Sequence, residues 1–340
     1  MKLIPRSARR ILLVVLLLAL GVMPLIPDLI PEQTWVTNSR LFSFTQMFML
    51  ITLASDWNLT GGFAGYVDFG HAVFFGIGAY GTGILMNYGW DFWPAMVLGA
   101  VFAVIFALII GYPTLRLKGP YFAIAMLGTF IAVREIVRVS KGLTGGVVGL
   151  TLPPYLNRPL FYWATFILAI LVVSVMWWIR RSEFGATLIA IREDEVGAEM
   201  RGINTTVNKI SAFAIAAFFT GIVGGLWAYQ NTFIDPDVVF FPSRTVELVM
   251  MSMLGGLGTV AGPVLGAATI YWMRDVVWAN FVEYHLLVEG VLLILIVLYT
   301  PEGIMGKLGD RNATSLQKLW RRKDKNSTES AEEVVEEVVP

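Results

Sequence analysis

The chain has 340 residues, of which 56% are hydrophobic and 15% are charged, and its formal net charge is zero. Soluble domains carry about 25% charged residues, so this composition argues against a soluble enzyme. The neutral charge balance does not favour nucleic-acid binding. The absence of cysteine excludes disulfides and thiolate catalysis, and the presence of only two histidines argues against a His-based metal site.

The apolar residues gather in blocks of about 20, the length that spans a hydrocarbon core, and they predict an all-α polytopic membrane protein with about ten transmembrane helices. A basic N-terminus precedes the first block, but no A-x-A cleavage site follows it, so we expect a retained span and not a cleaved signal peptide. The expected spans are 11–27, 41–58, 71–88, 93–112, 120–139, 159–179, 210–230, 244–256, 259–280 and 286–300.

The placement of Lys and Arg residues predicts that the N- and C-termini are both cytoplasmic, because this arrangement puts most of the cations inside. We expect a transmembrane domain over 1–306 and a cytoplasmic tail over 307–340. The tail is basic and then acidic and has no core-forming pattern, so we expect it to be mostly disordered.

Segment 181–209 is the longest hydrophilic stretch before the tail. A weak apolar stripe with charges on the remaining face predicts one short helix over 186–202, parallel to the membrane and closed by Gly202. Two interpretations fit this segment. It is a surface that docks a partner, or it is a solvated helix that joins two spans.

Glycines cluster in two similar stretches, LTGGFAG (59–65) and MLGGLGT (253–259), and this similarity suggests an internal repeat. The second stretch, followed by Gly262-Pro263, predicts a break between two shorter helices. Small residues let helix backbones approach closely in lipid. Glycine-interrupted segments at corresponding places in two halves also indicate a pathway at the repeat interface, and the two interpretations are compatible.

Ionisable residues within spans are costly in a bilayer. Asp56 and several others lie near predicted span ends, where snorkelling accounts for them. We expect His71, at the start of the third span, to be a hydrogen-bonded structural residue more often than a substrate contact. The chain has no regular ladder of acids, so a proton-driven pump is not favoured. It also has no Walker A motif, so we expect ATP hydrolysis elsewhere.

Six segments resemble, in the same order, the membrane-spanning permeases of branched-chain amino acid ABC importers, specifically the LivM-type subunit. They are LTGGFAGYVDFGHAVFFGIGAY (59–80), LRLKGPYFAIAMLGTF (115–130), LTGGVVGL (143–150), FGATLIAIREDEVGAEMRGIN (184–204), MLGGLGTVAGPVLGA (253–267) and PEGIMG (301–306).

The resemblance implies a non-catalytic permease of a bacterial inner membrane, with no cofactor or metal of its own. It implies four kinds of partner: a LivH-type second permease, two ATP-binding subunits that carry ATP and Mg, an extracytoplasmic substrate-binding protein and the bilayer. The residues that it assigns to coupling with the ATPase are Ala190, Ile191, Arg192, Glu193, Asp194, Glu195, Glu199 and Gly202. The residues that we expect along a translocation pathway are Gly61, Gly62, Tyr66, Asp68, His71, Thr144, Gly145, Gly146, Glu247, Gly255 and Gly256.

Two alternatives remain at the level of the sequence. A urea or short-amide permease of the same family would have the same architecture. A secondary transporter or channel that works without ATPases belongs to another class, and the missing acid ladder and the long hydrophilic segment argue against it.

Overall fold

The computed structural model describes residues 6–26, 37–154 and 158–280, together with isolated positions at 287, 290–291, 294 and 303–305. The tail predicted over 307–340 and most of the tenth predicted span lie outside these described residues.

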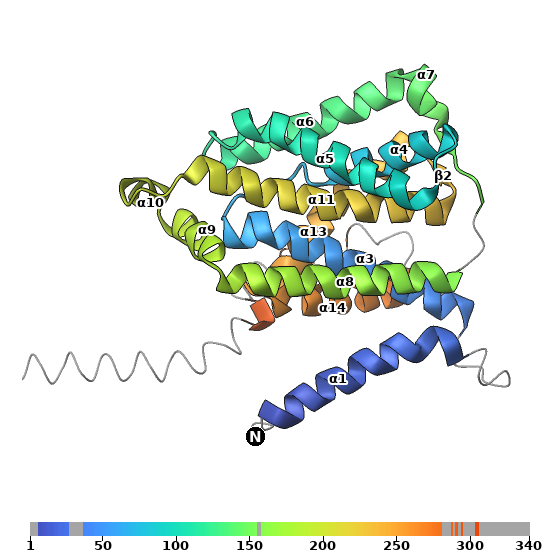
Figure 1. Ribbon diagram of the computed structural model, residues 1–340, viewed down its shortest axis with the longest axis horizontal. Helices are drawn as coiled ribbons and strands as arrows, with labels where there is room; N and C mark the ends of the chain where they lie inside the picture. The colour runs from blue at the N-terminus through green and yellow to red at the C-terminus, as the bar shows by residue number, and fades with distance from the viewer. Residues whose placement is uncertain are drawn as a thin grey trace, which may run out of the picture.

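The described chain is a bundle of long helices (Figure 1). Each of the first nine predicted spans overlaps one of these helices, with ends that differ by up to five residues. The long helices are α1 (Arg6–Val22), α3 (Asn38–Asn58), α4 (Ala72–Asn87), α5 (Phe92–Thr114), α6 (Pro120–Val139), α8 (Arg158–Arg181), α11 (Thr205–Asn231), α13 (Pro242–Gly255) and α14 (Ala261–Asn280). The short elements are η1 (Met23–Leu25), η2 (Leu59–Phe63), α7 (Lys141–Thr144), η3 (Gly146–Val148), β1 (Leu150–Thr151), α9 (Glu183–Glu193), α10 (Glu195–Met200), β2 (Phe233–Ile234) and α12 (Pro236–Val239).

Among the described residues, four helical segments are long and apolar enough to cross a membrane, namely Phe92–Thr114, Pro159–Arg181, Thr205–Asn231 and Pro236–Gly255. Shorter apolar helices cover Val14–Leu25 and Ala72–Asn87. Strand structure in the described chain is limited to β1 and β2, which pair antiparallel through two residues each. These features identify an all-α membrane protein.

Helix α11 lies at the centre of the bundle and packs against α3, α4 and α5. The contact between α4 and α11 depends on glycine: a Cβ atom at Gly78 would lie 2.1 Å from the carbonyl oxygen of Gly221, and one at Gly224 would lie 2.1 Å from that of Phe75. These two backbones therefore touch directly, as small residues permit in membrane helices.

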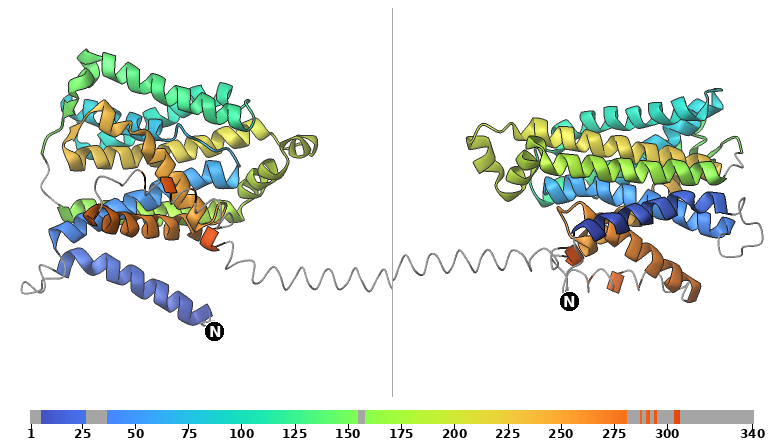
Figure 2. Two further views of the ribbon diagram at one scale, coloured as in Figure 1. Left: turned by 180° about the vertical axis from the view of Figure 1, so that it is seen from behind. Right: turned by 60° about the horizontal axis from the view of Figure 1, so that its bottom comes forward.

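A second layer contains α3, α8 and α14, with α13 packed against α14 (Figure 2). Aromatic rings fill the contact between α3 and α8, where the Phe48 ring meets those of Tyr162 and Phe166. The Tyr162 hydroxyl also donates to the Leu20 carbonyl at 2.7 Å, which attaches the last turns of α1 to α8. The first turns of α1 diverge from the bundle (Figure 1).

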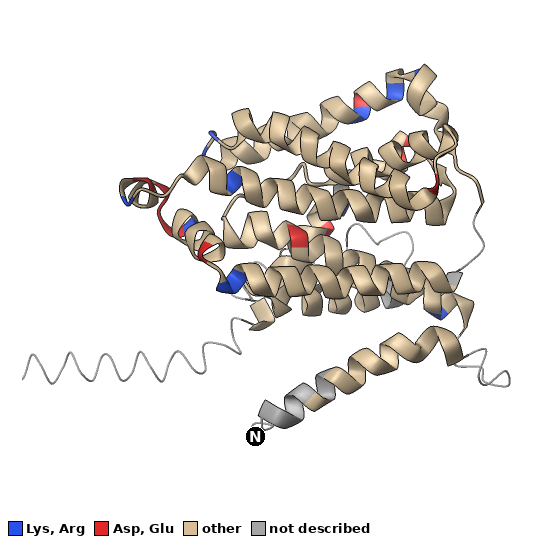
Figure 3. Ribbon diagram, in the orientation of Figure 1, with Lys and Arg blue, Asp and Glu red and all other residues tan. Residues whose placement is uncertain are grey.

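Charged residues lie mainly at the two ends of the bundle, and the end that carries α9 and α10 holds both signs (Figure 3). We call it the α9–α10 end. The middle of most helices is free of charge along the described residues, as a hydrocarbon environment requires.

Candidate functional site

The segment between α8 and α11 forms two short helices that project from the bundle, and we call Glu183–Met200 the α9–α10 arm (Figure 1). Helix α9 begins at Ser182, whose hydroxyl accepts a hydrogen bond from the Gly185 amide. The prediction of one helix over 186–202 is wrong. Asp194 has an extended backbone (φ −156°, ψ 100°), which interrupts the helix, and its carbonyl accepts from the Ala198 amide to start α10.

The arm ends as the sequence predicts. Gly202 adopts a left-handed conformation at φ 84°, which a residue with a side chain rarely takes, and the Ile203 amide donates back to the Ala198 carbonyl. Two residues later, the Asn204 side chain accepts from the Val207 amide and begins α11.

Lys209 lies at the centre of a polar cluster that joins the arm to the bundle. Its Nζ atom donates to Glu195 Oε1 at 2.6 Å, to the Leu115 carbonyl at 2.8 Å and to the Tyr66 hydroxyl at 3.0 Å. The Tyr66 hydroxyl donates in turn to Glu195 Oε2 at 2.6 Å. Only 4% of the Lys209 side chain is exposed, so its charge depends on these partners for stabilisation. We call Tyr66, Glu195 and Lys209 the Lys209 cluster.

The electrostatics of the Lys209 cluster favour an ion pair. Burial alone would raise the pKa of Glu195, but the hydrogen bonds from Lys209 and Tyr66 and the positive charges of Lys209 and Lys118 lower it below its usual range. Burial and the Glu195 carboxylate raise the pKa of Tyr66 above its usual range, so its hydroxyl keeps the proton that it donates.

Arg192 makes a second connection between the arm and the bundle. Its Nη1 atom donates to the Gly62 carbonyl at 2.8 Å, while Nε and Nη2 donate to Glu193. A Cβ atom at Gly65 would lie 2.5 Å from the Arg192 Cγ atom, and φ at Gly65 is 77°. Glycine at position 65 therefore leaves the space that the Arg192 side chain occupies.

The residues predicted to couple to an ATPase face two directions. Ile191 is buried, Glu195 and Arg192 bind the bundle as above, and Ala190 is half-buried. Five are exposed, namely Arg192, Glu193, Asp194, Glu199 and Gly202. The arm also exposes two apolar side chains that the prediction did not include, with Met200 at 85% and Val196 at 54%. Val196 and Met200 are four residues apart in α10 and therefore share one face of that helix.

The two glycine stretches meet at the α9–α10 end. The first forms η2, a single π-helical turn directly after α3, and such turns are frequent at functional sites. Asn58 connects it to the second stretch: its Nδ2 atom donates to the Thr259 carbonyl and its Oδ1 atom accepts from the Gly258 amide, both at 2.9 Å. A Cβ atom at Gly62 would lie 2.7 Å from the Gly258 nitrogen.

The predicted break after Gly255 is confirmed, since α13 ends there and φ is 121° at Gly256. A Cβ atom at Gly255 would lie 1.8 Å from the Gly262 carbonyl oxygen. A Cβ atom at Gly61 would lie 2.4 Å from the Trp57 ring. Gly61 and Gly255 therefore serve close packing.

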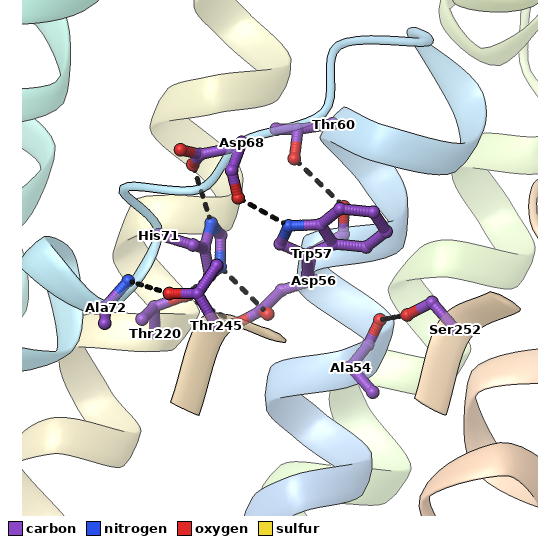
Figure 4. A network of polar contacts seen from close by, with 10 residues as sticks. All are labelled: Ala54, Asp56, Trp57, Thr60, Asp68, His71, Ala72, Thr220, Thr245 and Ser252. Carbon is purple, nitrogen blue, oxygen red and sulfur yellow. Dashed lines mark hydrogen bonds and ion pairs between the residues drawn. The ribbon is translucent and has the colours of Figure 1, made fainter. Parts of the chain in front are cut away.

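A fully buried polar network lies deeper in the bundle, where α3, α4 and α11 meet (Figure 4). His71 Nδ1 lies 3.1 Å from Asp68 Oδ2, and Nε2 lies 3.3 Å from Asp56 Oδ1 and 2.8 Å from the Thr220 hydroxyl. The Thr220 hydroxyl donates to Asp56 Oδ2 at 2.8 Å. We call these four residues the His71 network.

Two protonation patterns satisfy every contact of the His71 network. In both, the single hydroxyl proton of Thr220 goes to Asp56 and the same oxygen accepts from His71 Nε2–H. His71 Nδ1 then either donates to the Asp68 carboxylate, which gives a doubly protonated imidazole between two carboxylates, or accepts from a protonated Asp68. The expectation of a hydrogen-bonded structural histidine fits this geometry, whereas snorkelling does not describe Asp56, because its side chain is fully buried.

Thr144, Gly145 and Gly146 lie at the opposite end of the bundle. The Thr144 hydroxyl donates to the carbonyls of Val137 and Ser140 and thereby caps α6. Gly145 and Gly146 have φ values of 73° and 61°, so this turn requires glycine. The predicted pathway residues thus separate into an α9–α10-end group, the His71 network and this cap, while Glu247 is half-buried in α13.

Sequence reasoning missed three residues that organise these sites. Lys209 directly precedes an apolar block, a position from which the sequence predicts no more than a cation at a helix end. Asp56 lies 15 residues before His71, a spacing that no local pattern connects. Thr220 is one hydroxyl within an apolar helix, and nothing in the sequence distinguishes it from other threonines.

The comparison with known proteins supports the resemblance, and five of the six segments lie within the residues that the family profile matches. A family profile described as branched-chain amino acid transport system / permease component matches residues 39–297. The high-affinity branched-chain amino acid transport permease LivM is 28% identical in Salmonella typhimurium and 27% identical in Escherichia coli, in each case over 77% of this chain and 68% of the relative. The autoinducer 2 import permease LsrC of Salmonella typhi is 25% identical over 75% of this chain and 77% of its own length. No solved structure matches the chain. The chain therefore belongs to the family of branched-chain amino acid transport system permease components and is of the LivM type.

Proposed function

We propose that this chain is the transmembrane permease subunit of an ATP-binding-cassette importer for branched-chain or related amino acids. The α9–α10 arm is the observation that carries the proposal. The ion pair between Glu195 and Lys209 holds the arm against the bundle, and Val196 and Met200 are exposed on α10, which we call the tip of the arm. A helix that only joined two spans would not need an exposed apolar tip, whereas a docking surface for an ATPase subunit does.

The proposed topology has ten spans with both termini in the cytoplasm of a bacterial inner membrane. The arm then lies on the cytoplasmic side, and the cap around Thr144 faces outward. Supporting this orientation, Arg192 lies in α9, Lys209 binds Glu195 of α10, and Lys209 also binds the Leu115 carbonyl, directly before Arg116 in the chain. The permease domain covers 1–306, and the tail over 307–340 extends into the cytoplasm.

The proposed partners are a second, LivH-type permease, two ATP-binding subunits and an extracytoplasmic binding protein. This chain holds no cofactor in the proposal, and ATP and Mg belong to the ATP-binding subunits. ATP binding closes those subunits, the arm moves with them, and the bundle rocks to expose the pathway on alternate sides. The substrate released by the binding protein then passes between the two permeases.

One observation favours amino acids over other ligands of the family. The LivM relatives of Salmonella typhimurium and Escherichia coli are 28% and 27% identical to this chain, whereas LsrC is 25% identical. A urea or short-amide importer remains the alternative within the family. An ATPase-independent transporter is the alternative from another class.

Purification of the chain from its native membrane, followed by reconstitution in vesicles, tests the proposal. We expect two ATPase subunits and a second permease to copurify, and labelled leucine uptake to require ATP and the binding protein. Uptake by the purified chain alone, driven by an ion gradient, would contradict the proposal. ATP-dependent uptake of urea without leucine uptake would select the alternative substrate.

A further inference from the structure

The charged side chains of the α9–α10 arm divide by direction. Glu193 and Asp194 are exposed, whereas Glu195 and Arg192 turn back into the bundle. Glu199 is exposed, but its carboxylate accepts from the Thr205 hydroxyl of α11 at 2.7 Å. Only 16% of the Glu195 side chain is exposed, although it lies next to the exposed Asp194 and Val196. The arm is therefore attached by three charged groups, of which Glu195 and Arg192 are the two that turn inward.

The two inward groups bind three separate elements. Glu195 holds α11 through Lys209 and holds segment 64–71 through Tyr66. Arg192 holds η2 through the Gly62 carbonyl. Because hydrogen-bonded ion pairs are directional, displacement of α10 either breaks these contacts or moves the elements with it.

The attached segment is itself hydrogen-bonded as far as the His71 network. The Tyr66 amide donates to the Thr60 carbonyl at 2.9 Å. The Thr60 hydroxyl donates to the Trp57 carbonyl, and Trp57 Nε1 donates to the Asp68 carbonyl, both at 2.9 Å (Figure 4). These contacts fold residues 57–68 into one unit. A displacement of Tyr66 is therefore passed to Asp68 through residues that are hydrogen-bonded to one another.

We infer that the Lys209 cluster transmits the movement of the arm into the bundle, and that Glu195 and Lys209 are positioning residues for transport. This inference rests on the proposed function. They contact no ATPase in this role. They keep the arm, α11 and segment 64–71 in register, so that closure of the ATPase subunits moves all three together. Loss of the pair leaves docking intact and disconnects hydrolysis from transport.

The test measures leucine uptake and ATP hydrolysis together in the complete importer in vesicles, for Glu195→Gln, Lys209→Met and the double variant. We expect each single variant to keep its ATPase subunits and its hydrolysis rate but to lose about tenfold in leucine moved per ATP, within the range of coupling between sites. Because the two residues act as one pair, the double variant should be no worse than the worse single variant.

The control is Glu183→Gln, the same chemical change at an exposed position in the first turn of α9. It should leave the leucine-to-ATP ratio unchanged. The inference is overturned if either single variant keeps the wild-type ratio, if the losses multiply in the double variant, or if the ATPase subunits dissociate, since that last result means the pair only maintains the docking fold. Absence of ATP-driven uptake in the wild type would instead refute the proposed function, and this inference with it.

Discussion

Asn58 and Thr259 lie 201 residues apart in the chain, yet the Asn58 amide donates to the Thr259 carbonyl at 2.9 Å. The same side chain accepts from the Gly258 amide, so it satisfies two backbone groups of the turn between α13 and α14. One buried side chain thereby joins the end of α3 to a turn that belongs to the other half of the sequence.

Replacing Asn58 should therefore destabilise the bundle. Asn58→Leu leaves two backbone groups without partners, at a cost of about 1–3 kcal/mol for each group that remains buried. We expect a lower Tm for the detergent-solubilised protein. Asn231→Leu is the control, because Asn231 is exposed and caps only its own helix. Equal melting temperatures for the two variants would contradict this account.

The His71 network predicts an asymmetry between its members. His71→Leu leaves two buried carboxylates without their shared donor and should cost about 3–5 kcal/mol, enough to abolish folded expression in a marginally stable protein. Asp56→Asn keeps hydrogen-bonding groups beside His71 and Thr220 and removes one negative charge, so folded protein should remain. Size-exclusion profiles of tagged variants in detergent measure both outcomes. A folded His71→Leu variant would disprove the ionic description of the network.

The α4–α11 contact predicts opposite outcomes for two glycines. At Gly78 a methyl group would lie 2.1 Å from the Gly221 carbonyl oxygen, so Gly78→Ala must separate the helices and should cost about 1–3 kcal/mol. At Gly128 in α6 a methyl group meets nothing within 4 Å, so Gly128→Ala should be neutral or stabilise by up to about 1 kcal/mol. Thermal unfolding in detergent measures the Tm of both variants. A lower Tm for Gly128→Ala than for Gly78→Ala would contradict the close α4–α11 contact.

The Glu195 pKa gives a pH prediction. Because the fold lowers this pKa from its ordinary value of 4.5, the pair stabilises fully above that value, and the stabilisation is lost as pH falls through the lower folded-state pKa. The Tm difference between wild type and Glu195→Gln should stay constant from about pH 8 to about pH 6 and shrink only below about pH 4.5. A difference that changes across neutral pH would mean that another group controls the cluster.

The exposed tip of the arm gives a prediction about assembly. Met200→Asp replaces an 85% exposed apolar side chain with a charge, so the fold should be unaffected, while copurification of the ATPase subunits should fall about tenfold or more, as for a central interface residue. Val148→Asp makes the same kind of change at an 80% exposed residue of the opposite end and should leave the ATPase subunits bound. Loss of these subunits with Val148→Asp alone would place the docking surface elsewhere.

The sequence was informative where structure depends on local chemistry. Apolar block length and turn residues located the helices, and Gly202 and Gly256 marked helix ends because both positions have positive φ values. Family resemblance located the arm. The break at Asp194 was not predictable, because the flanking residues continue a helical pattern and only the attachment of Glu195 to Lys209 redirects the chain.

The polar clusters were beyond sequence reasoning for a different reason. Lys209, Tyr66 and Leu115 are far apart in sequence and meet only after α5 and α11 have packed. Asp68 and His71 are close enough for their pairing to be expected, but the second acid and Thr220 come from other helices. The periodicity and spacing of residues in a sequence describe one helix or strand at a time. The Lys209 cluster and the His71 network form between several elements, so these patterns do not predict them.

Thr220 completes the His71 network 164 residues after Asp56, and this separation affects the order of membrane insertion. At ribosomal elongation rates, about 8 to 33 s pass between synthesis of the two residues. During that interval Asp56, Asp68 and His71 lack their hydroxyl partner. We therefore expect the early helices to leave the insertion site only after α11 is made, and a chain truncated before Thr205 to be degraded.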